Sequence, residues 1–233
     1  MEAEFDRFAE DYLEILARNT AISGGEPAFF HKYKIEIVRN IARQSNLATA
    51  RIVDFGSGIG NSIPYFQEYF PESKLVCADT SPRSLEFAIR KHPGAAVPLL
   101  VTPPDPLDLP DDTVDLCFSA CVFHHIDHVE HFFWLSELLR ITRPGGAIVV
   151  FEHNPFNPLT RHAVNTCPLD VNACLVRPRA LARNACSAGW VRPAIAYRLF
   201  FPGFVARLRP LEAYLTGLPL GAQYSLHAVK PPS

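Results

Sequence analysis

The chain has 233 residues, of which 48% are hydrophobic and 20% are charged, and its formal net charge is −2. This composition is typical of a packed globular protein and excludes a disordered chain. A chain of this length is long for one small domain and short for two, so we expect one elaborated domain.

The small net charge hides an asymmetry along the chain. Residues 1–160 hold 13 Lys and Arg against 22 Asp and Glu, whereas residues 161–233 hold nine basic residues against Asp170 and Glu212. Either the two parts complement each other within the molecule, or the basic segment helps to bind an anionic ligand. The basic residues form no dense run and are not interleaved with aromatic side chains, so we expect no nucleic-acid partner.

The six cysteines form no Cys-x-x-Cys pair, so we expect no metal site. The N-terminal residues are too charged for a signal peptide, and no apolar run reaches membrane-spanning length. We therefore expect a cytoplasmic protein with reduced thiols and no membrane partner.

Two amphipathic helices are expected first in the chain. The first covers residues 1–20, and the second follows a break at residues 24–27. Their apolar stripes consist of Phe5, Phe8, Tyr12, Leu13 and Leu16 in the first, and Phe30, Tyr33, Ile37, Val38 and Ile41 in the second.

From residue 51 onwards, short apolar runs alternate with helical segments. This alternation predicts a parallel sheet with helices on both faces. The expected strands are 51–55, 74–79, 97–102, 114–120 and 147–153, and the expected helices are 59–69, 82–91 and 129–141. After these elements we expect a helix over 178–188 and strands over 191–201 and 223–230.

The loop after the first expected strand carries the main functional signal. It reads Asp54-Phe55-Gly56-Ser57-Gly58-Ile59-Gly60 and leads from a buried strand into a helix. Glycines there can adopt positive φ and let a ligand approach the backbone, and the helix behind them offers free amides. A dinucleotide fingerprint needs its third glycine one position later, where Asn61 stands. This spacing, with the acid before the first glycine, favours a ligand with a cationic end over a pyrophosphate.

A second acid, Asp79, ends the second expected strand about twenty residues after the loop. An acid at that place accepts the ribose hydroxyls of an adenosine-type ligand, so it supports a nucleoside without distinguishing one cofactor from another. On the loop alone, a tight strand–helix turn with a surface aspartate remains the alternative.

Four motifs in order resemble those of the class I S-adenosylmethionine-dependent methyltransferases. Residues 53–60 resemble the first motif, and residues 76–81 resemble the second. Residues 105–116 are similar to the acid–leucine–proline stretch that lines the adenine pocket, and residues 138–146 closely resemble the helix and turn before the fifth strand. The resemblance covers roughly residues 50–153. At the N-terminus, residues 5–12 are similar to the helix that caps the cofactor in the ubiquinone-biosynthesis-like branch.

The resemblance implies an α/β fold, a Rossmann-like three-layer sandwich. Its mixed seven-stranded sheet would have an antiparallel last strand, under an N-terminal helical cap. One methyltransferase domain would cover residues 1–233, with the cap at 1–46, the cofactor-binding core at 50–153, and the acceptor-side segment with the last two strands at 154–233. The implied cofactor is S-adenosyl-L-methionine. Its expected contacts are Tyr12, Tyr33, Asp54, Gly56, Ser57, Gly58, Asn61, Asp79, Thr80, Asp105, Leu107 and Ser119.

Two histidines follow neighbouring strands at the edge where ligands bind in open α/β sheets. His125 follows the fourth expected strand, and His153 ends the fifth. Methyl transfer is an in-line displacement at a sulfonium methyl, and a hydroxyl acceptor must also lose its proton, for which imidazole is suited. We therefore expect His125 and His153 to be catalytic; for each, a loop histidine that satisfies backbone groups is the alternative. His124 is expected to point away from its neighbour, and the sequence allows His125 to pair with Asp127.

Residues 152–161 contain two Asn-Pro steps, which predict an extended, rigid path along the acceptor wall. Nearby arginines, Arg161, Arg177 and Arg179, would either hold a carboxylate or phosphate or form an ordinary solvated surface.

The sequence thus predicts a methyltransferase that acts on a small molecule, with oxygen as the first choice of nucleophile and nitrogen next. The interpretation of the basic segment as a ligand site makes this acceptor anionic. The alternatives are a protein that binds S-adenosylmethionine without methyl transfer, as a regulator or cyclase, and a nicotinamide-dependent oxidoreductase, against which the glycine spacing argues. The oligomeric state is not predicted.

Overall fold

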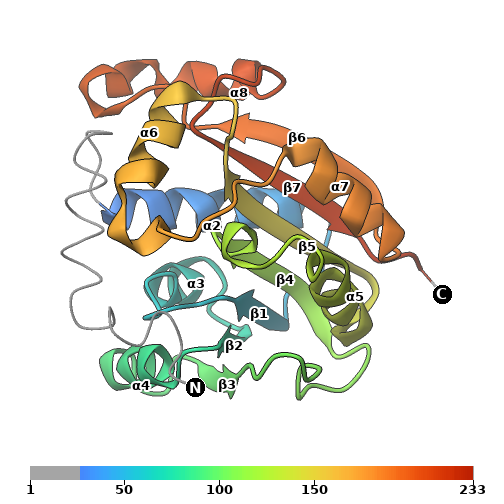
Figure 1. Cartoon of the computed structure of the whole chain (residues 1–233). Helices are drawn as coiled ribbons and strands as arrows, with labels where there is room; N and C mark the ends of the chain where they lie inside the picture. The colour runs from blue at the N-terminus through green and yellow to red at the C-terminus, as the bar shows by residue number, and fades with distance from the viewer. Residues whose placement is uncertain (1–26, 233) are drawn as a thin grey trace.

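The computed structural model describes residues 27–232, so the expected N-terminal helix with Tyr12 lies outside the described residues. Seven strands form one sheet in the order β3-β2-β1-β4-β5-β7-β6 (Figure 1). β7 runs antiparallel to β5 and β6, and the pairs from β3 to β5 are parallel. The strands are β1 Arg51–Phe55, β2 Lys74–Asp79, β3 Val97–Leu100, β4 Val114–Ala120, β5 Thr142–His153, β6 Val191–Arg198 and β7 Gln223–Val229. The predicted fold class, with its antiparallel last strand, is confirmed.

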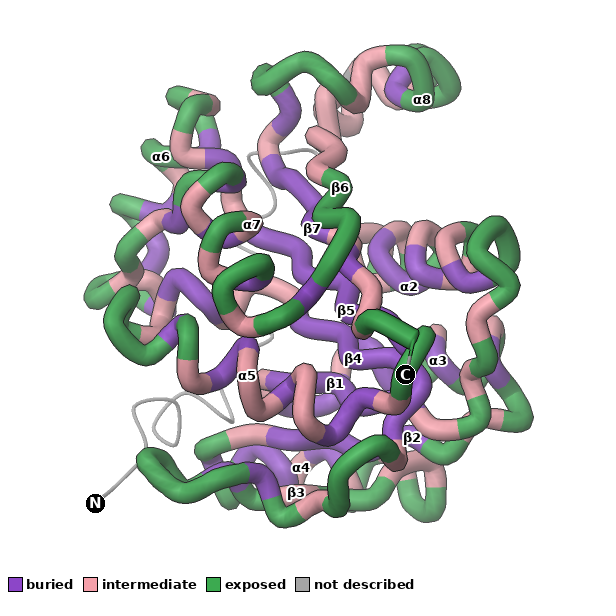
Figure 2. Tube along the Cα trace, turned by 90° about the vertical axis from the view of Figure 1, so that its right-hand side faces the viewer, coloured by how far each residue is buried: buried purple, intermediate pink, exposed green. Residues whose placement is uncertain are grey.

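Helices cover both faces of this sheet and enclose two apolar cores. On one face lie α2 (Pro27–Gln44), α3 (Ile63–Tyr69) and α4 (Pro82–Lys91), and on the other lie α5 (His131–Ile141) and α7 (Pro178–Ser187). Figure 2 shows the buried chain running through β1, β4 and β5, between the two helical layers. Strands buried on both faces need continuous apolar runs, which is why these segments lack polar alternation. None of the helices in residues 27–232 is both long and apolar enough to cross a membrane.

The expected helix over 59–69 begins only at Ile63, because the chain first completes a turn. Gly60 has φ +75°, and a Cβ there would lie 2.8 Å from the Cβ of Ala88 in α4. The glycine therefore allows the turn before α3 to approach α4 closely, and the helix starts after that contact.

The prediction of an extended path over residues 152–161 is wrong beyond Asn157, where helix α6 (Pro158–Thr166) begins. The Asn157 side chain accepts hydrogen bonds from the backbone N–H groups of Leu159 and Thr160, at 2.9 and 3.0 Å. Asparagine at the N-cap followed by proline at the first helical position is a strong helix start. The Asn-Pro step therefore marks a helix boundary.

We expect Asn157→Ala to lower the free energy of unfolding by about 1–2 kcal/mol, because it removes the cap of α6. It also removes the bond from Asn157 Nδ2 to the carbonyl of Leu220. Urea unfolding followed by circular dichroism measures the loss. The matched control is Asn40→Ala, at an exposed position within α2, which should be neutral or slightly stabilising. An equal effect of the two substitutions would contradict the capping role.

Candidate active site

The glycine loop after β1 folds back against β2 and packs against the loop after β4. The backbone N–H groups of Gly56 and Ser57 both donate to the carbonyl of Ala78, at 2.7 and 3.1 Å. Gly56 has φ +76°, and a Cβ there would lie 2.2 Å from a methyl group of Val122. Gly58 has φ +52°, but a Cβ there would meet no atom of residues 27–232 within 4 Å. Gly56 is therefore required for packing, whereas the space beside Gly58 is open.

Asp79 holds the glycine loop as well as ending β2. One carboxylate oxygen accepts from Gly58 N at 2.7 Å, and the other accepts from Ser81 N at 2.9 Å. Asp79 thus fixes the loop at the place where the sequence predicts a nucleoside.

Asp54 is an acid buried at the carboxyl end of β1, with only 2% of its surface exposed. Its Oδ2 has no hydrogen-bond partner among the described residues, and the same holds for the buried hydroxyl of Ser119 on β4. Burial, and then the charge of Asp79, raise the pKa of Asp54 to about 8, although Lys34 acts in the opposite direction. Unsatisfied buried acceptors of this kind call for a bound group. A ligand with a cationic end and a nucleoside, such as S-adenosylmethionine, fits the residues present.

The other predicted cofactor contacts lie at different depths, and their roles stay predictions. Thr80 and Asp105 are exposed, and Asn61 is half-buried. Leu107 is buried in the core on the α5 side of the sheet. Tyr33 donates its hydroxyl to Glu212 at 3.1 Å, which ties α2 to the segment 200–215 rather than leaving the phenol free.

A buried carboxylate, Glu152 near the end of β5, organises the loop after β4. Its Oε1 accepts from the backbone N–H groups of Val122 and Phe123, at 3.0 and 2.7 Å. Its Oε2 accepts from His124 Nδ1 at 2.6 Å, and both side chains are almost completely buried. Burial disfavours the charge on His124, but Glu152 and Asp170 outweigh it and raise the pKa of His124 to about 10. The interaction also holds the pKa of Glu152 below its ordinary value.

Asp170, in the short helix η3 (Pro168–Asp170), brings the two adjacent histidines together. Its Oδ1 lies 3.4 Å from His124 Nε2 and 3.3 Å from His125 Nε2, and the two rings are 4.2 Å apart. The prediction that His124 points away from His125 is therefore wrong, because both side chains turn toward Asp170. Asp127 does not take part; its carboxylate accepts from Val129 N at the start of the next turn.

Two residues near this cluster were missed in the sequence analysis: Lys34 and Cys121. The Lys34 ammonium is buried and donates to Cys121 Sγ at 3.5 Å, and Gln223 donates to the same sulfur at 3.6 Å. Burial acts to raise the pKa of Cys121, but Lys34 and His153 lower it to about 6. The signal in the sequence was a lysine four residues before Val38, on the apolar face of its helix. A lysine there has to find a polar partner at the sheet edge.

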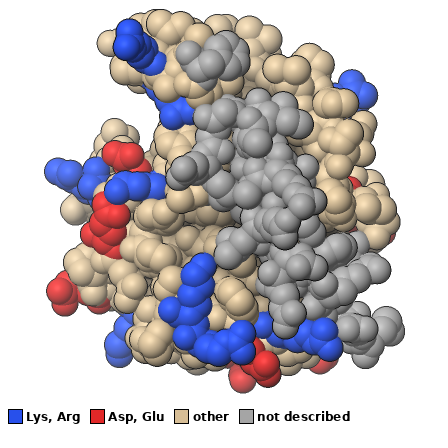
Figure 3. All heavy atoms as spheres, turned by 90° about the vertical axis from the view of Figure 1, so that its left-hand side faces the viewer, with Lys and Arg blue, Asp and Glu red and all other residues tan. Residues whose placement is uncertain are grey.

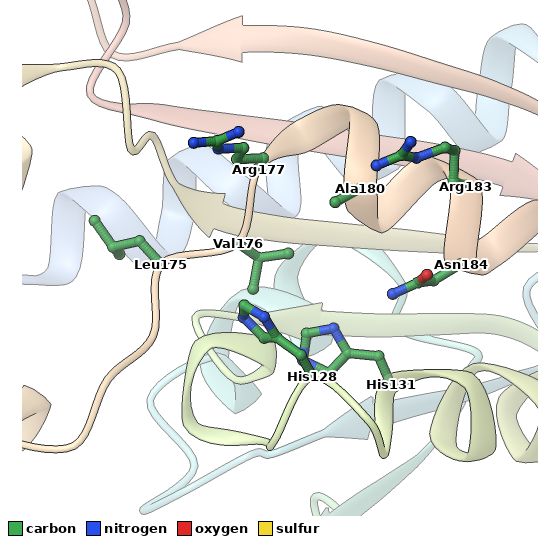
Figure 4. Close-up of a pocket in the computed structure, with 8 residues that line it drawn as sticks. All are labelled: His128, His131, Leu175, Val176, Arg177, Ala180, Arg183 and Asn184. Atoms are coloured by element: carbon green, nitrogen blue, oxygen red, sulfur yellow. The ribbon is translucent and has the colours of Figure 1, made fainter.

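A hollow of about 350 Å³ lies between the start of α5 and α7, and Figure 4 shows the residues that line it. Arg177 and Arg183 are among its eight lining residues, none of which is acidic. His131 at its floor donates to the carbonyls of Phe123 and Ile126, at 2.8 and 3.1 Å, and so holds the loop that carries His124 and His125. The other two predicted anion-binding arginines, Arg161 and Arg179, are exposed on α6 and α7.

A sheet with this strand order, a glycine loop after β1 and an acid after β2 is the fold of the class I S-adenosylmethionine-dependent methyltransferases. Residues 53–150 match the family described as "Methyltransferase domain". Residues 53–150 are therefore similar to a methyltransferase domain, and the described residues have the fold of the class I superfamily.

Two curated relatives each match less than half of the chain. A trans-aconitate 2-methyltransferase of Methylobacterium nodulans is 36% identical over 111 residues, which cover 47% of this chain and 41% of that protein. A malonyl-[acyl-carrier protein] O-methyltransferase of Hahella chejuensis is 31% identical over 98 residues, which cover 42% of this chain and 34% of that protein. The chain thus spans less than half of the length of these relatives.

Solved structures extend the similarity of fold to nearly the whole chain. An S-adenosylmethionine-dependent methyltransferase of Thermotoga maritima superposes with a TM-score of 0.65 over 97% of both chains, at 19% identity. Phosphoethanolamine N-methyltransferase 2 of Haemonchus contortus, solved with S-adenosylmethionine, gives a TM-score of 0.64 over 98% of this chain and 60% of that one, at 14% identity. At this level of identity, the likeness concerns the fold.

The raised pKa of Asp54 makes the stability of the ligand-free protein depend on pH. An aspartate in the unfolded chain ionises near pH 4, whereas Asp54 in the folded chain ionises at about 8. Between these values the folded state binds the extra proton, so the free energy of unfolding falls as the pH rises from about 4 to about 8. One group contributes up to about 1.4 kcal/mol per pH unit.

Asp54→Asn should remove that contribution, so its stability should fall less steeply than that of the parent over this range. Urea unfolding of both proteins at several pH values between 5 and 8 measures the difference. Parallel curves for parent and variant would show that Asp54 ionises normally in the folded state.

Proposed function

We propose that this chain is an S-adenosylmethionine-dependent methyltransferase that acts on an oxygen of a small molecule. One observation carries the proposal: the open glycine loop and the histidine loop are in direct contact. A Cβ on Gly56 would overlap Val122, which lies three residues before His125. A cofactor over Gly58 would therefore place its reactive end beside the histidines.

Each residue of the cofactor side has a role in this proposal. The buried carboxylate of Asp54 binds the cationic end of the cofactor, and Asp79 accepts hydrogen bonds from the ribose. The cofactor, when bound, supplies a methyl group on a sulfonium. Since the sulfonium is already reactive, the protein mainly aligns donor and acceptor and excludes water.

His125 and His153 act on the acceptor. Asp170 orients the His125 ring through Nε2, and the pair lies at the carboxyl edge of β4. The His153 ring packs 5.0 Å from His124, at the end of the neighbouring strand β5. Imidazoles at this edge are placed to hold the acceptor oxygen and to take its proton as the methyl group is transferred.

We further propose that the acceptor is anionic. The names of the relatives, a trans-aconitate and a malonyl-group methyltransferase, describe carboxylated acceptors, and the second describes transfer to oxygen. In this chain, Arg177 and Arg183 line a hollow without acidic residues, close in sequence to Asp170. On the face shown in Figure 3, by contrast, basic side chains gather toward the lower edge, with acidic ones among them. We therefore assign the carboxylate of the acceptor to this hollow.

Calorimetric titration with S-adenosylmethionine and with S-adenosylhomocysteine tests the cofactor assignment. We expect both to bind, with one site per chain, and incubation with a panel of small carboxylic and hydroxy acids to release S-adenosylhomocysteine. Failure of both cofactor forms to bind would overturn the proposal. Binding without release for any acceptor would favour a protein that only binds the cofactor.

The two loop glycines allow packing and ligand contact to be separated. Gly56→Ala should lower the melting temperature, because the new Cβ overlaps Val122 in addition to the strain of positive φ. Gly58→Ala carries only the strain, roughly 1–2 kcal/mol, but should weaken S-adenosylhomocysteine binding at least tenfold by occupying the open space. Differential scanning calorimetry and titration calorimetry measure the two effects. Unchanged affinity of the Gly58 variant would place the ligand elsewhere.

His153→Ala should lower turnover about 10²–10⁴-fold, the usual contribution of a proton-transferring group, with little effect on cofactor affinity. Turnover with the acceptor found in the panel, and S-adenosylhomocysteine affinity, are measured side by side. The control is His162→Ala, an exposed histidine on α6, which should leave both values unchanged. A variant at position 153 with full turnover would remove this residue from the mechanism.

A further inference from the structure

Three side chains at the carboxyl edge of the sheet form a group with the chemistry of a metal site. One ligand atom from each of His124, His125 and Asp170 lies within 4.8 Å of the others. Imidazole nitrogen and carboxylate oxygen are ligands for divalent transition metals, Zn²⁺ above all. The sequence analysis expected no metal because it relied on cysteine spacing, and Asp170 lies 45 residues from His125 in the sequence.

The distances within the group suit a tetrahedral ion. Asp170 Oδ1 lies 3.4 Å from His124 Nε2 and 3.3 Å from His125 Nε2. Zinc holds its nitrogen and oxygen ligands at about 2.0–2.1 Å, so adjacent ligand atoms of a tetrahedron lie roughly 3.3–3.4 Å apart. The two distances from Asp170 therefore have the length that a tetrahedral ion requires, and the ligand atoms of the two histidines lie within 4.8 Å of each other.

The outer contact that a metal-binding histidine needs is in place for His124. The other ring nitrogen of a ligating histidine almost always donates to a carboxylate, a carbonyl or water. His124 Nδ1 donates to Glu152 Oε2 at 2.6 Å, and Glu152 is fixed by the backbone N–H groups of Val122 and Phe123. This contact keeps one proton of His124 on Nδ1, so Nε2, which faces Asp170, is the nitrogen that can bind an ion in place of its own proton.

Hydrogen bonds are the other way to hold these atoms together, because Nε2–H of His124 and Nε2–H of His125 can both donate to Asp170. A dication bound to both rings in their neutral form would neutralise the two carboxylates, Glu152 and Asp170. The site is also accessible, because His125 and Asp170 each keep 13% of their side-chain surface exposed.

We propose that His124, His125 and Asp170 bind one divalent transition-metal ion, Zn²⁺ in the first place, and leave its fourth position open. Three protein ligands and an open position are the arrangement of catalytic zinc sites. Binding of the ion releases the proton shared by His124 and Asp170. The role of the ion rests on the proposed function: the acceptor oxygen takes the open position, where its proton is lost more easily. His125 is then a ligand, and His153 is left to take the proton.

The test uses the full-length chain without a histidine tag, stripped of metal by chelator. Titration with ZnCl₂ is expected to give one ion per chain and to raise the melting temperature. Titration with CoCl₂ is expected to give the visible absorption of tetrahedral cobalt. His125→Ala and Asp170→Asn should each weaken Zn²⁺ binding at least tenfold, whereas His128→Ala, an exposed histidine in the same loop, should not.

Several outcomes would overturn the metal site. They are the absence of stoichiometric binding, unchanged binding in both ligand variants, and a cobalt–thiolate charge-transfer band, which would assign the ion to cysteines. If circular dichroism shows that the variants fail to fold, X-ray absorption of the zinc-loaded parent still counts the imidazole ligands. Two imidazoles are expected, and a count of zero would contradict the proposal.

Titration of metal-free protein with S-adenosylhomocysteine separates the metal site from the proposed function. Cofactor binding without metal binding contradicts the site alone, and metal binding without cofactor binding contradicts the proposed function alone.

Discussion

The acceptor side of this molecule depends on the burial of one carboxylate, that of Glu152. Removing an ionised carboxylate from water is costly unless every lone pair finds a donor, and a buried charge with one partner removed destabilises a protein by several kcal/mol. Glu152 meets this requirement with two backbone N–H groups of the loop after β4 and with the ring of His124. Those three bonds fix the path of the chain between residues 121 and 125. The position of both histidines is therefore a consequence of satisfying a charge in the core of the sheet.

The cofactor side is held by an acid in a different way. Asp79 remains partly exposed, and its oxygens accept from Gly58 and Ser81, so it shapes the glycine loop before any ligand arrives. Between the two sides lies the contact of Gly56 with Val122, at which a side chain on the loop would collide with the histidine loop. The two halves of the site thus share one interface. Their relative placement is set by packing, which tolerates little displacement in a close-packed interior.

The fold was largely predictable from the sequence, because its strands are buried and its loops carry strong turn signals. Strands 51–55, 74–79 and 114–120 and the helix Pro82–Lys91 have the predicted bounds. One segment was misjudged because its local pattern is compatible with two structures. The step Asn157-Pro158 was interpreted as an extended path but caps a helix. No element was predicted between the last two expected strands, where the structure forms the short helices η4 (Gly203–Leu211) and α8 (Glu212–Leu215).

The site was predictable only where the chain itself brings residues together. The glycine loop and the two strand-end acids lie at positions fixed by the strand–turn–helix pattern, so the sequence located them. Asp170 and Lys34 reach the site from elements distant in the chain, and nothing in the sequence pairs them with His125 or Cys121. The possible pairing of His125 with Asp127 rested on their proximity in the sequence alone. Short separation along the chain does not place two side chains face to face.

The buried acid of the cofactor loop shows how ligand and protein are coupled in the proposed enzyme. Without a ligand, Asp54 keeps its proton up to about pH 8, because burial and Asp79 both disfavour its charge. A cationic group beside Oδ2 would reverse that preference, since an opposite charge at short range favours the ionised carboxylate. The proton is then expelled when the cofactor binds, and the ligand's cation replaces it. A loop built in this way would favour a cationic ligand. An anionic pyrophosphate would not stabilise the ionised form of Asp54, and the neutral carboxyl group would offer it only one hydrogen-bond donor.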